Sequence, residues 1–140
     1  MSTHAVAHLD ELPRIPASGD GEAAWTPIRH ALGIGGFGVN AWHGDHAGDV
    51  VIEEHDELVE NGDGGDEELY LVLSGQARFT VAGEEVVAGP GTLVSVPPHI
   101  RREAVATRDA TTILAIGAPR GDAYRPDAWE RRAVENAGLA

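Results

Sequence analysis

Residues 66–102 constrain the fold more than any other part of the chain, because they combine β-favouring runs with closely spaced turns. Residues 69–73 are continuously apolar, which is typical of a strand buried on both faces. Residues 76–82 alternate polar and apolar side chains, and residues 85–88 predict a further short strand. Three turn signals separate these runs: Ser74-Gly75, Gly83-Glu84 and Gly89-Pro90-Gly91. The segment therefore predicts an all-β fold.

The rest of the chain predicts more strands and two short helices. Thr26-Pro27 has the form of a cap followed by a proline at the first helical position, and predicts a helix over 28–32. Asp127 and Glu130 have the spacing of a capping box, and predict a second helix over 128–136. Alternating or apolar runs predict strands at 35–43, 49–57, 100–106 and 111–117.

Length and charge limit the kind of protein and its partners. The 140 residues are enough for one domain with a real core and too few for two domains of ordinary size. The formal net charge of -13, from 23 acidic and 10 basic residues, repels phosphate backbones and anionic lipid headgroups. We therefore expect neither a nucleic-acid partner nor a membrane partner.

Two further features of the chain concern its location and its chemistry. No apolar run approaches the length of a membrane span, and the first residues lack the basic end and apolar middle of a signal peptide, so we expect a cytoplasmic protein. The chain contains no cysteine, which excludes disulfides, thiolate nucleophiles and sulfur-ligated metals.

A longer pattern identifies a family. Glu68 is followed by six residues and Gly75, then by a Gly-Pro-Gly turn, a strand and a Pro-Pro run at 97–98. Over residues 35–117 this pattern resembles the cupin superfamily of small β-barrels. The resemblance implies an all-β, cupin-type jelly-roll barrel over 23–120, with an N-terminal arm at 1–22 and a C-terminal helical tail packed on the barrel at 121–140. It also implies a homodimer, since cupins commonly pair their barrels.

The resemblance argues against the usual metal site of this family. Cupins generally carry two histidines, one residue apart, shortly before the glutamate of the first motif, and a third histidine at the end of the second motif. The first pair falls on Gly62 and Gly64 here, a frequent extra histidine falls on Asp66, and the last falls on Arg102. Only Glu68 remains, so we expect no metal and no other cofactor.

Glu68 and Arg102 are the residues that the resemblance turns toward one another inside the barrel. An arginine is always charged, cannot bind a metal, and can pair with a carboxylate. One interpretation is a metal-free pocket that binds or isomerises a polar or anionic small molecule, in which Arg102 fixes the ligand and Glu68 is the general base. The other is a buried ion pair that only closes the barrel.

His55 supports a second functional hypothesis. It stands on the predicted strand that delivers the histidine pair in related barrels, and His55 with Glu57, or Glu53 with His55, has the same one-residue spacing. His55, Glu57 and Glu68 would then form a site for Fe, Mn, Ni or Zn in a dioxygenase or isomerase. The alternative is an edge strand whose charges face solvent.

Two more side chains are candidates for contact with a ligand. Tyr70 follows Glu68 at the spacing of one strand face, and His99 follows two prolines near the expected mouth of the barrel. The pKa of a histidine lies near neutrality, so His99 is a candidate proton shuttle, or else an exposed loop residue. A third hypothesis is a non-catalytic, dimeric interaction module. The sequence does not identify a substrate.

Overall fold

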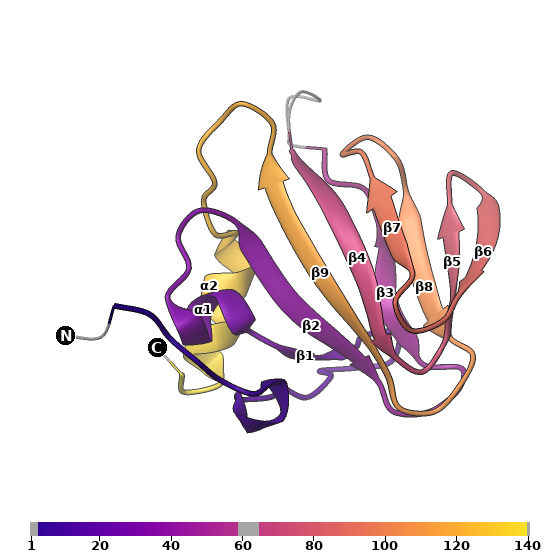
Figure 1. The fold of residues 1–140 in the computed structure, drawn as a ribbon, viewed down its shortest axis with the longest axis horizontal. Coiled ribbons are helices and arrows are strands. Elements are labelled where there is room, and N and C mark those ends of the chain that lie inside the picture. The colour runs from indigo at the N-terminus through magenta and orange to yellow at the C-terminus, as the bar shows by residue number, and fades with distance from the viewer. Residues whose placement is uncertain (1–2, 59–64, 140) are drawn as a thin grey trace.

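The computed structural model describes residues 3–58 and 65–139, and within them the chain forms nine strands in two facing antiparallel sheets (Figure 1). The five-stranded sheet contains, in spatial order, β1 (Ala24–Thr26), β2 (Gly38–Gly44), β9 (Thr111–Pro119), β4 (Asp66–Ser74) and β7 (Leu93–Val96). The four-stranded sheet contains β3 (Val50–His55), β8 (Arg102–Ala106), β5 (Ala77–Val81) and β6 (Glu84–Ala88). The predicted all-β jelly-roll architecture is confirmed.

The core lies between the two sheets. Strand side chains alternate between the two faces of a sheet, and the inward-facing ones are apolar over most of their length. The rings of Tyr70 and Phe79, from opposite sheets, lie 5.8 Å apart. Twelve residues of the described chain form this buried cluster, among them Val51, Val72 and Ile113.

Strand β4 differs from its prediction in one respect. Glu68, Tyr70 and Val72 face inward, and the alternate residues face outward on the five-stranded sheet. Leu69 and Leu73 are 37% and 42% exposed, so the prediction that residues 69–73 are buried on both faces is wrong. The reason is that a two-layer sandwich covers only the inner face of each sheet.

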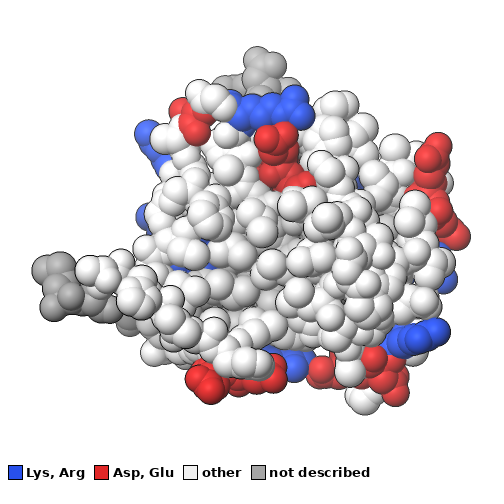
Figure 2. All heavy atoms as spheres, viewed as in Figure 1, with Lys and Arg blue, Asp and Glu red and all other residues white. Residues whose placement is uncertain are grey.

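The outer face of the five-stranded sheet is apolar and carries few charges. Figure 2 shows this side of the molecule, where uncharged atoms cover the centre and charged side chains gather at the rim. Register pairs bring Leu71, Leu93 and Leu114 side by side on this face, and Leu69 lies beside Ile116. Leu93 is 61% exposed, so the face is open to solvent in the single chain.

Three helical segments complete the described chain: a 3-10 turn η1 (Leu9–Glu11), α1 (Ile28–Leu32) and α2 (Ala128–Asn136). The bounds of α1 and α2 agree with the predicted ranges, but the predicted capping contacts are absent. Pro27 occupies the N-cap of α1, while the hydroxyl of Thr26 contacts His43 Nε2 at 2.8 Å. No helix in the ranges 3–58 and 65–139 is long and apolar enough to cross a membrane.

Helix α2 is attached to the barrel by three tryptophans and one ion pair. The rings of Trp25 and Trp42 stack at 5.4 Å, and the ring of Trp129 lies 5.4 Å from Trp25 and 6.1 Å from Trp42. Arg29 of α1 donates from Nε to Glu130 Oε2 at 2.8 Å. These contacts fix the N-terminal end of α2 beside the inner face of β2.

We expect a substitution in the Arg29–Glu130 pair to lower the stability of the fold strongly, because both side chains are largely buried. Their side chains are 13% and 3% exposed. Arg29→Ala leaves the buried Glu130 carboxylate without its partner, and we expect the free energy of unfolding to fall by roughly 3 kcal/mol. Urea unfolding of the variant beside the wild-type chain measures this loss.

Arg120→Ala is the matched control. Arg120 and Glu67 pair at 2.7 Å, but their side chains are 69% and 50% exposed, so we expect a loss below about 0.5 kcal/mol. Equal losses in the two variants would contradict a stabilising role for the Arg29–Glu130 pair.

Candidate functional site

A cavity of about 480 Å³ opens between the inner face of the five-stranded sheet, the end of β3 and the start of α2. Most of the side chains that line it are polar or aromatic. They come from β2 (Asn40, Trp42), β3 (Glu53, His55), β4 (Asp66, Glu68, Tyr70), the segment after β3 (Asp56, Glu57) and the C-terminal region (Tyr124, Asp127, Trp129, Glu130).

Two glycines make room for the polar side chains. Gly117 of β9 is opposite Glu68 in the register, and a Cβ at Gly117 would lie 3.2 Å from Glu68 Cγ. Gly65 has a φ of +92°, and a Cβ there would clash with the carbonyl oxygen of Glu57. Only glycine fits this position, so the chain can pass close beside Glu57 where it enters β4.

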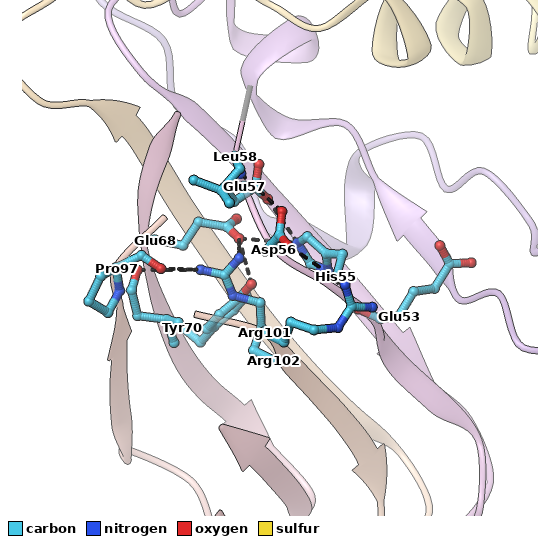
Figure 3. A network of polar contacts seen from close by, with 11 residues as sticks. Glu53, His55, Asp56, Glu57, Leu58, Glu68, Tyr70, Pro97, Arg101 and Arg102 are labelled. Carbon is cyan, nitrogen blue, oxygen red and sulfur yellow. Dashed lines mark hydrogen bonds and ion pairs between the residues drawn. The ribbon is translucent and has the colours of Figure 1, made fainter. Parts of the chain in front are cut away.

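Glu68 is at the centre of the polar network in Figure 3. Its Oε1 accepts a hydrogen bond from the Tyr70 hydroxyl at 2.6 Å. The same oxygen lies 3.4 Å from His55 Nε2 and 3.9 Å from Arg102 Nη1. One hydrogen-bond donor, Tyr70, and two cationic groups, His55 and Arg102, therefore surround one carboxylate oxygen, and they come from three strands, β4, β3 and β8.

His55 lies between acceptors on both sides of its ring. Nε2 contacts Glu57 Oε1 at 2.8 Å, and Nδ1 contacts the carbonyl oxygen of Glu53 at 2.6 Å. Burial by itself lowers the pKa of His55, but the hydrogen bonds to Glu57 and Glu68 outweigh it and raise the pKa to about 10. Because only the protonated ring can donate from both nitrogens, His55 is an imidazolium at neutral pH.

The two glutamates of the network have pKa values shifted in opposite directions. Burial raises the pKa of Glu57 to about 7, with a further contribution from the Glu68 charge and despite the hydrogen bond to His55. Burial also acts to raise the pKa of Glu68, but hydrogen bonds from His55, Glu57 and Tyr70 bring it below its usual range. Neighbouring carboxyls with separated pKa values are typical of acid–base sites.

Two other groups near Glu68 respond to burial and to its charge. Burial, together with the Glu68 charge and hydrogen bond, raises the pKa of Tyr70 well above its ordinary value, so the phenol stays protonated. Burial raises the pKa of Asp66 to about 6, and the charges of Asp127 and Glu68 act in the same direction.

Arg102 lies behind Glu68 and does not line the cavity. Its side chain is fully buried, and Nη2 donates to the carbonyl oxygens of Pro97 at 2.9 Å and Val96 at 3.5 Å. Nε and Nη1 have no hydrogen-bond partner among the described residues. The structure therefore brings Arg102 and Glu68 together, but it places the guanidinium where it contacts Glu68 and the chain, not a ligand in the cavity.

The structure gathers His55, Glu57, Glu68 and Tyr70 at one end of the cavity and leaves His99 outside it. His99 is exposed in the turn before β8 and borders a separate hollow with Arg101. Gly62 and Gly64 lie outside the described residues.

Sequence reasoning did not identify Asn40 or Asp127 as cavity residues. Asn40 shares an inward face of β2 with Trp42, a period-two signal that could have been used. Asp127 was interpreted as a helix cap, but the structure shows no capping bond from its side chain, so the predicted capping box is wrong. Instead, its carboxylate borders the cavity.

Comparison with known families identifies the chain. A model of the cupin domain matches residues 48–117, which is half of the chain and includes β3 to most of β9. The protein belongs to the cupin superfamily. A search of curated proteins finds no significant match.

Solved cupin structures share the fold at low sequence identity. A sugar phosphate isomerase from Silicibacter pomeroyi has a TM-score of 0.67 at 21% identity, over 81% of this chain and 75% of that one. KdgF from Halomonas has a TM-score of 0.65 at 18% identity, over 86% and 94%. The nucleoside dehydratase Pac13 from Streptomyces has a TM-score of 0.58 at 18% identity, over 91% and 88%. At these identities the likeness defines the fold alone.

The residues of this cupin do not fit the usual metal site of the superfamily. Arg102 occupies the position of the last histidine ligand, and its buried cation lies 3.9 Å from Glu68 Oε1. A guanidinium cannot coordinate a metal, and a second cation beside it would be repelled. The nonstandard set remains: one ligand atom each from His55, Glu57 and Glu68 lie within 4.8 Å of one another.

Opposite pKa shifts at two histidines give a direct prediction. His43 contacts Thr26 and Thr112 through its ring nitrogens, and burial lowers its pKa, with a further contribution from Arg14. We expect nitrogen chemical shifts of a neutral ring for His43 and of an imidazolium for His55 at pH 8, measured by ¹⁵N NMR.

The two histidines are controls for each other, since solvent and salt affect both. His55→Gln identifies its own signals. A neutral His55 ring at pH 8 would show that the contacts to Glu57 and Glu68 do not hold the proton.

Proposed function

We propose that this cupin is a metal-independent enzyme that binds a small polar molecule in the cavity and isomerises it by proton transfer. The observation that carries the proposal is the set of groups around Glu68 Oε1: the Tyr70 hydroxyl, which donates a hydrogen bond at 2.6 Å, and the cations of His55 at 3.4 Å and Arg102 at 3.9 Å. These groups already balance the negative charge of Glu68, which stands at the position of the metal-binding glutamate of related barrels. Glu57, the other carboxyl that contacts His55, lines the cavity beside them.

The network has a base and an acid in adjacent positions. Glu57, with a pKa of about 7, is ionised in a large fraction of molecules at neutral pH and can accept a proton from a ligand carbon next to a carbonyl group. The electron pair of that C–H bond then forms a C=C bond, and the carbonyl oxygen takes a proton from the His55 imidazolium. The former carbonyl carbon then takes the proton from Glu57. The hydroxyl group on the first carbon gives its proton to His55 and becomes the new carbonyl, so that both side chains regain their starting protonation states.

Glu68 is a positioning residue in this proposal. It contacts His55 Nε2 and is itself held by Tyr70 and Arg102. Two structural relatives are described as a sugar phosphate isomerase and a nucleoside dehydratase, so this fold is found in enzymes that act on small polar molecules.

Exchange with deuterated water tests the proposal without knowledge of the product. Neutral hydroxy-ketones and hydroxy-aldehydes, beginning with dihydroxyacetone and glyceraldehyde, are incubated with the protein in D₂O and followed by ¹H NMR. We expect the protein to accelerate exchange at the carbon next to the carbonyl, and Glu57→Gln to reduce this rate about 100-fold or more.

Glu54→Gln is the matched control, because Glu54 is close in sequence but contacts Arg101 on the surface. It should leave the exchange rate unchanged. Full exchange activity in Glu57→Gln would contradict the role of Glu57 as the base.

A divalent metal site is the second candidate function, and the clustered ligand atoms of His55, Glu57 and Glu68 favour it. The contact of His55 Nδ1 with the Glu53 carbonyl is the kind that orients a metal-binding histidine. These three residues would hold Fe, Mn, Ni or Zn, which would act as a Lewis acid. The metal would replace the proton that lies between His55 Nε2 and Glu57 Oε1.

Metal content of protein purified without an affinity tag separates the two candidates. The metal-independent proposal predicts well below one equivalent of Fe, Mn, Ni or Zn by mass spectrometry of the elements. About one equivalent in the wild type, and its loss in His55→Gln, would establish the second candidate instead.

We also propose that two copies associate through the apolar outer face of the five-stranded sheet. Each copy carries a net charge of -13, so two copies repel one another through most of their surfaces. The face that contains Leu69, Leu71, Leu93 and Leu114 lacks those charges, and a two-fold axis would place it against itself. A homodimer buries the leucines that the single chain exposes.

Leu93→Glu and Val87→Glu form a matched pair for this proposal, since the side chains are 61% and 60% exposed. Val87 lies on β6 in the other sheet. Light scattering during size-exclusion chromatography should give a dimer mass for wild type and Val87→Glu, and the mass of one chain for Leu93→Glu. A wild-type chain that is a monomer, or a Leu93→Glu dimer, would contradict the proposed interface.

A further inference from the structure

We propose that the ligand of this cavity carries a positively charged amine, held by the carboxylates of Asp66 and Asp127 beside the rings of Trp42 and Trp129. The inference rests on one part of the proposed function, that the cavity is the ligand site. It does not depend on the reaction that follows.

The charges around the cavity are strongly unequal. Among the described residues that line it, seven carry a carboxyl group, and His55 is the one basic side chain. Four of those carboxyls already have a cationic partner. Glu57 and Glu68 contact His55, Asp56 lies 3.7 Å from Arg101, and Glu130 accepts from Arg29 at 2.8 Å.

Of the other three carboxyls, Glu53 is exposed, and Asp66 and Asp127 have no cation among the described residues beside them. The Asp66 side chain makes no hydrogen bond or ion pair with any residue in 3–58 or 65–139. Asp127 precedes α2, yet its side chain gives no capping bond to the helix, and the Trp129 side chain is its hydrogen-bond partner. A ligand cation between these carboxylates would supply the missing charge.

The hydrogen-bonding groups of an amine fit this lining. An ammonium group has three donors and no acceptor, so it suits two carboxylates. The carboxylates would repel a phosphate or a carboxylate in the ligand, so the anionic ligand that the sequence suggested through Arg102 is disfavoured.

The aromatic wall favours an organic amine over a metal ion at this end of the cavity. Trp42 and Trp129 both line it, and their rings lie 6.1 Å apart. Indole faces attract organic cations by cation–π interaction, whereas a small divalent ion takes oxygen ligands. A volume of about 480 Å³ also suits a small organic molecule.

Three probes of one size and three charges test the inference: benzylamine, benzyl alcohol and benzoate at pH 7. Tryptophan fluorescence and amide chemical shifts of cavity residues report binding. We expect dissociation constants on the order of 1 mM for benzylamine, at least about tenfold weaker binding of benzyl alcohol, and no saturation by benzoate. Asp66→Asn should remove most of the preference for the amine.

Glu84→Gln is the control for net charge, because Glu84 lies on β6 and does not line the cavity. It should bind benzylamine like the wild type. Equal binding of the three probes, or preferred binding of benzoate, would overturn the inference and leave the cavity as a ligand site. Binding of none of them at cavity residues would overturn it as well, while the deuterium exchange assay tests the proton-transfer proposal separately.

Discussion

The site depends on Glu68, a largely buried carboxylate whose negative charge must be balanced by groups inside the barrel. Glu68 faces the inner side of the five-stranded sheet, where water gives little solvation, and an unpaired charge in such a place is costly. In this protein Tyr70, His55 and Arg102 provide the compensation. Arg102 is itself acceptable in the core because two backbone carbonyls, of Val96 and Pro97, accept hydrogen bonds from it.

This compensation explains how the other groups of the network titrate. With Glu68 held as the anion, the nearby Glu57 is disfavoured as a second anion, and its pKa rises toward neutrality. His55, between the two carboxyls, keeps its proton. Because side chains alternate along a strand, Glu68 and Tyr70 lie on the same face of β4. His55 is the last residue of β3 and Arg102 is the first residue of β8, and both of these strand ends lie beside Glu68.

Much of the fold could be predicted from the sequence, because turns and strand periodicity are local properties. The helices at 28–32 and 128–136, and every strand of the described chain except the three-residue β1, were predicted in this way. The cluster of His55, Glu57 and Glu68 could be suggested from spacing and family resemblance. The burial of Arg102 could not be predicted, since it depends on where β8 and the turn after β7 lie relative to Glu68. Nor could Asp127 be separated from an ordinary helix cap, because the same residue type serves both purposes.

The order in which Glu57 and Glu68 lose their protons shows whether Glu68 is the carboxyl that the network holds as the anion. Carboxyl ¹³C NMR titration, with signals assigned by Glu57→Gln and Glu68→Gln, measures both groups in the folded protein. We predict that Glu57 titrates near pH 7 and that Glu68 stays ionised to below the usual range of a glutamate. A Glu68 carboxyl that takes up its proton at a higher pH than Glu57 would contradict this prediction.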